Sequence, residues 1–257
     1  MKVNGRATRE ELISTPLPLW EDSYTCIPNK TIFDKIDENI RGGGLKVKNE
    51  VYRVSRTESG IIKGVIGSID IMTSNEEYGQ RFMFRNSYDK SMSFAVAIGN
   101  FVMICENGCV RADNFEYKRK HSGIADSESL LNIDAGFESI DKEFKIIAEQ
   151  MDNLKQCHVD YELMHNLVGN LFFEQGVISS TQINIIKDQM WNGDKFKHIN
   201  DADYSAYDLY NNITESLKKS NVYSFIQDHA KTHKLFENTF LKQSEPVIID
   251  TPVLEEA

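Results

Sequence analysis

The chain has 257 residues, of which 40% are hydrophobic and 26% charged, which is typical of a globular protein with a sizeable core. No apolar run approaches the roughly 18 residues that a membrane-spanning helix needs, so we expect no membrane partner. The formal net charge of -10 argues against uniform affinity for nucleic acid. The charge is uneven, because residues 1–125 carry a net +2 and residues 126–257 a net -12. A polyanion would therefore bind to the first half of the chain.

The N-terminal segment is predicted to be extended. Pro16, Pro18 and Pro28 lie within residues 1–29 and favour an arm rather than a helix. The segment has no apolar region of the kind found in secretion signals, so we expect a cytosolic protein with reduced cysteines.

The next part of the chain changes from helical to strand-like periodicity. Apolar residues from Ile32 to Ile40 share one helical face, and three glycines from Gly42 to Gly44 end that helix. From residue 45 to 110, β-branched and aromatic runs alternate with glycines, which predicts an antiparallel meander.

Helical spacing takes over after about residue 126. Apolar residues from Phe137 to Leu154 recur every three or four positions, and Ser179 with Gln182 forms a capping-box pattern. Strands followed by helices in separate runs predict an α+β fold with the helices packed on the sheet. We therefore divide the chain into an extended arm, an α/β part, a helical part and an acidic flexible tail, at residues 1–29, 30–125, 126–240 and 241–257.

Two polar segments flank the most apolar stretch of the chain. Asparagine and aspartate in RNSYDKS and the Asn-Gly pair in CENG favour turns beside adjacent strands, with Cys105 buried and unpaired. The alternative is a polar site at a strand end. Its residues would be Arg85, Asn86, Ser87, Asp89, Ser91 and Asn107. No serine here has an evident base partner, so we assign no catalytic residue.

Histidines and cysteines do not form a recognised metal motif. Cys105 and Cys109 lack a second pair, and His229 and His233 share a helical face without the glutamate of HExxH. His158 and His165 lie near Cys157 in a loose group. We assign no metal and no cofactor, and we leave metal binding by the four histidines open.

A basic segment with interleaved aromatic residues follows the predicted sheet. Cations that track phosphates beside rings that stack on bases are typical of single-stranded nucleic-acid binding. A solvated charge run before a helix is the alternative interpretation. The candidate residues are Arg111, Phe115, Tyr117, Lys118, Arg119, Lys120 and His121, with a second basic stretch at Lys46, Lys48 and Arg53.

Several landmarks together resemble a known family. TPLPLWEDSYTCIPN, RNSYDKSMSFAVAIGNFVMICENGCV, RKH and YDLYNNITESLK are similar to landmarks of phage and plasmid-like proteins with domain of unknown function 932, in that order. Tyr207 and Asn212 stand where the family often has tryptophan and alanine. The resemblance covers about residues 15–220 and implies a mobile-element origin and the cytoplasm of a bacterial host. It implies no reaction.

Three functions remain as hypotheses. The first is a non-enzymatic protein that binds single-stranded nucleic acid in phage DNA metabolism, of the annealing or recombination type. The second is an interaction protein whose acidic helical half docks on a host protein and blocks or redirects a host system. The third is an enzyme of unknown reaction. The oligomeric state, including a homo-oligomer, is left open.

Overall fold

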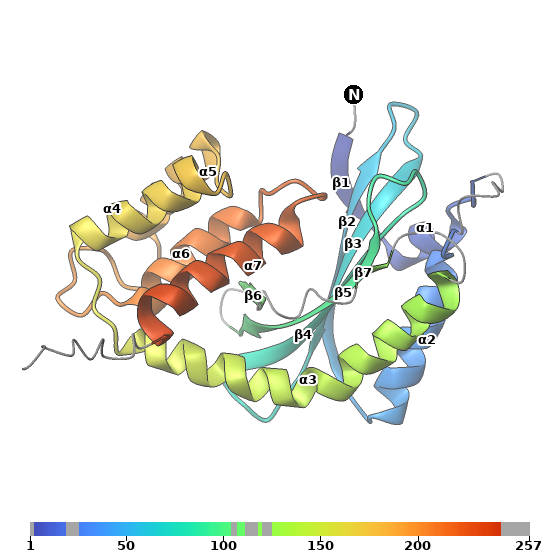
Figure 1. Ribbon diagram of the computed structural model, residues 1–257, viewed down its shortest axis with the longest axis horizontal. Coiled ribbons are helices and arrows are strands. Elements are labelled where there is room, and N and C mark those ends of the chain that lie inside the picture. Colours follow the sequence, from blue (N-terminus) through green and yellow to red (C-terminus); the bar gives the residue numbers. More distant parts are fainter. Residues whose placement is uncertain (1–2, 19–25, 104–106, 111–117, 120–124, 243–257) are drawn as a thin grey trace, which may run out of the picture.

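The computed structural model describes residues 3–18, 26–103, 107–110, 118–119 and 125–242. A twisted antiparallel sheet runs through the molecule, with helices on both of its faces (Figure 1). This arrangement is the α+β fold predicted from the sequence, and the helical C-terminal part packs beside the sheet.

The sheet is a meander with every neighbouring pair antiparallel. Its strands are β1 (Val3–Ala7), β2 (Val47–Arg56), β3 (Ile62–Ile71), β4 (Tyr78–Ser87), β5 (Phe94–Val102) and β6 (Gly108–Val110). A short strand, β7 (Lys118–Arg119), also pairs with β5. The prediction of an antiparallel meander across residues 45–110 is confirmed.

The prediction of an extended arm without a helix at residues 1–29 is wrong for its first half. Strand β1 adds to the edge of the sheet beside β2, and helix α1 (Arg9–Ser14) follows it. Thr8 caps this helix, because its side chain accepts a hydrogen bond from the Glu11 amide while the Glu11 carboxylate accepts one from the Thr8 amide. The prolines restrict only their own neighbourhood, and Pro16 comes after the helix has ended.

One face of the sheet is apolar and packs against two helices, α2 (Asn29–Gly42) and α3 (Ala125–Lys155). Strand alternation places Phe82, Phe84 and Ile98 on this face, all buried. Phe33 of α2 meets Phe84 edge to face with ring centroids 5.7 Å apart, and the Phe82 ring stacks on Phe137 of α3 at 4.4 Å.

Helix α3 joins this core to a second one. Its Ile140 packs under the sheet, whereas Ile147, Met151 and Leu154 pack among the C-terminal helices, which explains its long apolar seam. Those helices are α4 (Tyr161–Gly169), η2 (Asn170–Glu174), α5 (Ser180–Asn192), α6 (Ala206–Leu217), α7 (Phe225–Phe236) and η3 (Glu237–Leu241). The capping box predicted at Ser179 is present at the start of α5.

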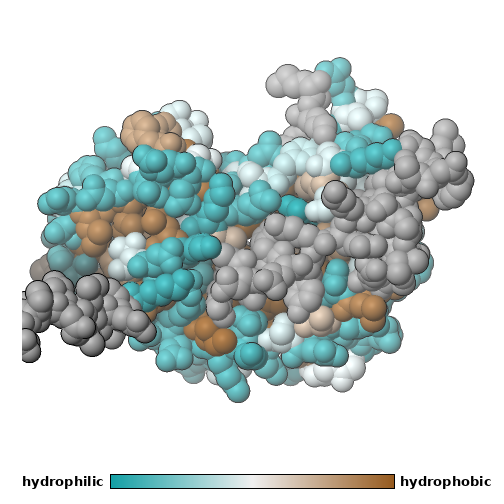
Figure 2. Space-filling view, viewed as in Figure 1, coloured by the Kyte–Doolittle hydropathy of each residue, from teal (hydrophilic) through white to brown (hydrophobic). Residues whose placement is uncertain are grey.

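The other face of the sheet is only partly covered. Ile66, Met83 and Ala97 pack against Phe225 and Ile226 of α7. Beyond that contact the same face carries charged side chains from β1, β2, β3 and β4. Hydrophilic residues dominate the described surface in the space-filling view, and hydrophobic ones form only small groups (Figure 2). The charged part of the sheet and the helices beside it form the candidate site.

Candidate anion-binding site

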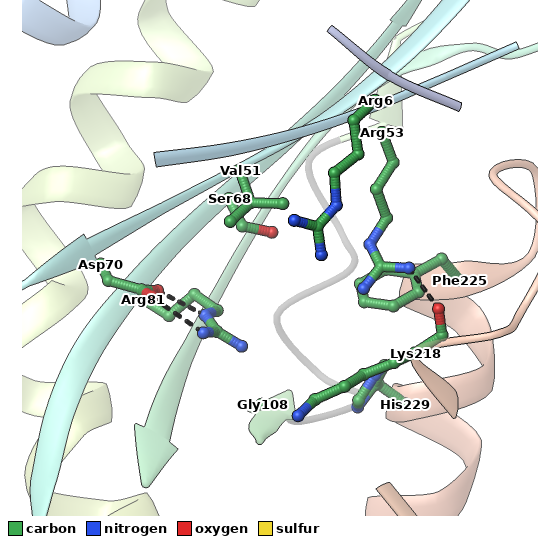
Figure 3. Close-up of a pocket in the computed structure, with 10 residues that line it drawn as sticks. All are labelled: Arg6, Val51, Arg53, Ser68, Asp70, Arg81, Gly108, Lys218, Phe225 and His229. Atoms are coloured by element: carbon green, nitrogen blue, oxygen red, sulfur yellow. Dashed lines mark hydrogen bonds and ion pairs between the residues drawn. The ribbon is translucent and has the colours of Figure 1, made fainter. Parts of the chain in front are cut away.

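A cavity of about 110 Å³ lies between the charged face of the sheet and helices α6 and α7 (Figure 3). This volume is below the roughly 300–1,000 Å³ typical of sites for whole small molecules, so it suits a group of a few heavy atoms. The lining residues are Arg6, Val51, Arg53, Ser68, Asp70, Arg81, Gly108, Lys218, Phe225 and His229.

Strand pairing explains why charges from distant positions meet in this cavity. Residues directly opposite one another on neighbouring strands project from the same face of a sheet. Arg6 of β1 is paired with Arg53 of β2, and Asp70 of β3 is paired with Arg81 of β4. The register therefore brings three arginines from three strands onto one face.

Arg81 and Asp70 form a buried ion pair at the inner end of the cavity. Arg81 Nε and Nη2 donate to the two Asp70 carboxylate oxygens at 2.6 and 3.0 Å, and the side chains are only 10% and 2% exposed. Gly108 lies beside this guanidinium, and a Cβ at that position would come within 2.6 Å of Arg81 Nη1. The glycine of the CENG segment thus leaves room for Arg81.

Arg6 and Arg53 form no ion pair with any carboxylate in the described part of the chain. The Arg53 guanidinium lies 4.5 Å from the centre of the Phe225 ring, and its Nη1 donates to the Lys218 carbonyl. Burial, with smaller contributions from Arg6 and Arg81, lowers the pKa of Arg53 to about 10, so it remains charged at neutral pH. Two cations therefore face this cavity without a carboxylate partner among those residues.

The remaining cation of the lining, Lys218, is partly compensated. Its ammonium is 2.7 Å from the carboxylate of Glu215, one turn earlier in α6. The cavity lining itself contains four cationic side chains and one carboxylate, that of Asp70. Such an excess of positive charge in a partly enclosed cavity favours an anionic ligand.

His229 of α7 is the most unusual group in the lining. It is 2% exposed, and neither ring nitrogen makes a hydrogen bond of good geometry among the described residues, although an interaction with the Gly108 backbone acts to raise its pKa. Burial, and then the charges of Arg81 and Arg53, lower its pKa to about 3, so the ring is neutral at pH 7. A neutral imidazole offers one N–H donor and one acceptor, and leaving buried groups of this kind unpaired costs about 1–3 kcal/mol each. A ligand in the cavity would supply partners.

Arg53 is the residue of the second predicted basic stretch that reaches the cavity. Lys48 lies outside it, with its ammonium 4.9 Å from the centre of the Phe101 ring. The Arg81 guanidinium lies 5.3 Å from the centre of the same ring, so both cations contact Phe101. Lys46 is exposed and precedes β2.

The main predicted basic segment is only partly described. Lys118 and Arg119 form β7, where Lys118 pairs with Ala95 of β5. The predicted residues that lie outside the described part of the chain are Arg111, Phe115, Tyr117, Lys120 and His121. A continuous cross-strand row nevertheless joins the cavity to β7 in register, through Arg6, Arg53, Ile66, Arg85, Ala95 and Lys118.

The predicted turn at RNSYDKS begins later than expected, because Arg85, Asn86 and Ser87 are buried residues of β4. Burial lowers the pKa of Arg85, whose Nε and Nη2 donate to the Ser93 backbone carbonyl and hydroxyl oxygens. Asp89 accepts a hydrogen bond from the Ser91 amide, so the turn itself lies there, as predicted.

Asn86 holds the N-terminal segment to the sheet. Its Nδ2 donates to the Ile27 carbonyl at 2.8 Å and to Asn29 Oδ1 at 3.0 Å. The Asn29 amide in turn donates to the Tyr88 hydroxyl at 2.8 Å. Two sequence landmarks, IPN and RNSYD, are thus joined by buried hydrogen bonds.

The remaining members of the predicted polar site have separate contacts. Ser87 bridges the turn, because its hydroxyl donates to the Met92 carbonyl and accepts from the Met92 amide. Asn107 Nδ2 donates to the Asn211 carbonyl of α6 at 2.9 Å, which joins CENG to the LYNN landmark. The structure therefore distributes these residues over several packing contacts instead of one site, and Cys105 lies outside the described residues.

His229 and His233 share a helix but meet different groups. His233 Nδ1 lies 3.2 Å from the thiol of Cys109, and its Nε2 lies 3.1 Å from Gln150 Oε1. Cys109 forms no disulfide and is 4% exposed. Among the described residues, no three histidine, cysteine or carboxylate side chains are grouped as metal ligands would be.

The sequence predicted only Arg53 as a binding residue among the ten residues that line the cavity. Arg6, Arg81 and Lys218 were assigned to no site, His229 was considered only as a possible metal ligand, and no short motif links them. The alternation in RFMFR, with Arg81 and Arg85 on one face and Phe82 and Phe84 on the other, was the available signal of a charged sheet face.

Comparison with known proteins identifies a family without an assigned function. A family model described as "Domain of unknown function (DUF932)" matches residues 16–240. No curated protein and no solved structure gives a significant match. Arg53, Arg81, Lys218 and His229 fall within the matched region, whereas Arg6 precedes it. None of the helices in the described ranges is long and apolar enough to cross a membrane.

Proposed function

We propose that this chain, which belongs to the DUF932 family, binds single-stranded nucleic acid on the charged face of its sheet, with a phosphate group in the cavity. One observation carries the proposal. Arg6 and Arg53 converge on a cavity that also holds Arg81 and Lys218, and neither Arg6 nor Arg53 has a carboxylate partner among the described residues. Phosphate is the anion that a nucleic-acid strand supplies.

The chemistry of the lining suits phosphate oxygens. A guanidinium presents N–H donors in a planar fork that matches a phosphate, and such charge-assisted hydrogen bonds are the stronger ones. Phe225 holds the Arg53 guanidinium by a cation–π contact and so limits its freedom before a ligand arrives. At about 110 Å³ the cavity is too small for a nucleoside, so the base and sugar would stay outside.

The cross-strand row of residues favours a single-stranded nucleic acid, rather than an isolated anion, as the ligand. Neighbouring strands lie about 4.8 Å apart, so the five steps from β1 to β7 extend over about 24 Å. Arg6 and Arg53 occupy one end of this row and Lys118 occupies the other. Arg85, between them, is buried against Ser93 and contributes positive potential rather than a contact. The acidic charge of residues 126–257 favours approach of an anionic strand from the sheet side.

Fluorescence anisotropy with a labelled single-stranded oligonucleotide at low salt tests the proposal. The double variant Arg6→Ala/Arg53→Ala should weaken binding for all sequences. It should lower the slope of log affinity against log salt by about 0.7, the value for one phosphate contact, because both arginines face the same cavity. The matched control is Lys30→Ala/Arg41→Ala, which removes two exposed cations from α2 on the opposite face.

Two results of the anisotropy measurements would contradict the proposal. If the wild type binds no oligonucleotide, the proposal fails, and a host-directed interaction protein becomes the better hypothesis. If the α2 control loses as much affinity as the cavity variant, binding depends on net charge and not on this site. Thermal unfolding of each variant shows whether a loss of affinity comes from a loss of folded protein.

The basic segment around β7 supplies a second, independent test. Replacing Lys118, Arg119 and Lys120 with alanine should reduce the salt slope in the same way. Tyr117→Ala should weaken binding by about 1–3 kcal/mol where a base stacks on the ring. Unchanged affinity in both variants would confine the interface to the cavity end of the sheet.

A further inference from the structure

We propose that the cavity is a subsite for the terminal phosphate of a strand, a phosphomonoester, and not for an internal phosphodiester. This inference rests on the proposed function, since it names which phosphate of the bound strand enters the cavity. Two features of the cavity carry it: its uncompensated charge and the buried imidazole of His229.

The cationic and imidazole side chains of the lining differ in exposure. Arg6 is the one exposed residue of the lining, Arg53 and Lys218 are half-buried, and Arg81 and His229 are 8% and 2% exposed. In Figure 3 these side chains enter the cavity from opposite sides, with the sheet on one side and α7 on the other. The lining thus places one exposed arginine, Arg6, beside groups that are more deeply buried.

The charge of the cavity matches a monoester. A phosphomonoester carries about -1.5 to -2 at pH 7, because its second pKa is near 6, whereas a phosphodiester carries one charge. Arg6 and Arg53 are the two lining cations without a carboxylate partner among the described residues, while Arg81 is paired with Asp70 and Lys218 with Glu215. Two uncompensated cations are neutralised by a dianion and only half neutralised by a diester.

His229 adds a chemical distinction between the two kinds of phosphate. Its neutral ring has one nitrogen that donates, and neither nitrogen makes a hydrogen bond of good geometry among the described residues. A monoester dianion has three unesterified oxygens, so one can accept a hydrogen bond from the His229 N–H while the others face Arg6 and Arg53. A diester has only two such oxygens. A monoester therefore supplies a separate acceptor for the imidazole and for each of the two arginines.

The test compares three internally labelled oligonucleotides of one sequence, which carry a 5′-phosphate, a 3′-phosphate or two hydroxyl ends. We expect one phosphorylated form to bind wild-type protein at least tenfold more tightly than the hydroxyl form in an anisotropy titration. Equal affinities for all three would overturn the inference and leave the proposed function intact. No binding of any of them would remove both.

Two variants at His229 locate the preference. His229→Leu removes both polar groups and should abolish the preference for the phosphorylated end, while His229→Gln keeps a neutral donor and acceptor and should retain most of it. A preference that persists unchanged in His229→Leu would refute the role of the imidazole. If that variant does not fold, Arg53→Gln in its place should reduce the preference, because it removes one of the two uncompensated cations.

Competition separates a strand end from free phosphate. Inorganic phosphate and a nucleoside monophosphate are each titrated against the complex with the phosphorylated oligonucleotide. Both should compete at high concentration, and the oligonucleotide without a terminal phosphate should compete less well than the phosphorylated one. Displacement by inorganic phosphate at the same concentration as the phosphorylated strand would show an anion site unconnected with strand ends and would contradict the inference.

Discussion

Protein stability should fall between pH 7.5 and pH 5 because of His229, and this loss should disappear in the His229→Gln variant. The folded state holds the pKa of the imidazole at about 3, through burial and the nearby charges of Arg81, Arg53 and Lys218. In the unfolded chain the group returns to its ordinary pKa of 6.5. Between these values only the unfolded state binds the proton, so lowering the pH favours unfolding.

The size of the effect follows from the difference between the two pKa values. At pH 7.5 both states are essentially neutral at this position and the contribution is close to zero. A pH of 5 lies 1.5 units below the pKa of 6.5 that the imidazole has in the unfolded chain. At 1.36 kcal/mol per unit, protonation of the unfolded chain lowers the free energy of unfolding by about 2 kcal/mol. The lost stability is regained as the pH rises through 6.5, because the folded-state pKa is the lower one.

Urea denaturation at pH 5 and at pH 7.5 measures this contribution of His229 to stability. The free energy of unfolding of the wild type minus that of His229→Gln should be about 2 kcal/mol smaller at pH 5 than at pH 7.5, since other titrating groups cancel in the difference. Buffers should be free of phosphate, because an anion bound in the cavity would stabilise the folded state. His165→Gln, at an exposed position of α4, is the control.

Two results would refute the reasoning. A difference between wild type and His229→Gln that is the same at both pH values would mean that the imidazole does not stay neutral in the folded protein. An equal change in the His165→Gln control would mean that the effect is not specific to the buried ring.

Two further predictions concern the packing around the site. Gly108→Ala should destabilise the protein by about 1–3 kcal/mol, because the new Cβ would lie 2.6 Å from Arg81 Nη1 and an ion pair holds that guanidinium in place. Thermal unfolding measures the loss. In the control Gly5→Ala no atom lies within 4 Å of the new Cβ, so its stability should stay within about 1 kcal/mol of wild type. Asn86→Ala should cost about 2–3 kcal/mol and speed proteolysis near residue 27, since it removes two buried hydrogen bonds to that segment; unchanged cleavage would contradict its role as a clasp.

The sequence by itself determined the local structure of this protein. β-branched and aromatic runs broken by glycines predicted the meander, and three- and four-residue spacing predicted the helices, because these patterns depend on near neighbours. Ser179 and Gln182 were enough to locate the start of α5. Two local predictions were wrong. The prolines suggested an extended segment although Thr8 and Glu11 form the capping box of a helix, and the polar residues Arg85 to Ser87 suggested a turn although they belong to a buried strand.

Only the tertiary structure decided where the site lies. Arg53 was a candidate on composition, but its role depends on pairing with Arg6 of an unexpected edge strand and on stacking against Phe225, more than 170 residues away. His229 looked like a surface or metal-binding histidine, whereas docking of α7 on the sheet buries it beside Arg81. Alternation along a strand determines which residues share a face. The pairing register and the helix that covers that face depend on burial summed over the whole chain, which no local pattern contains.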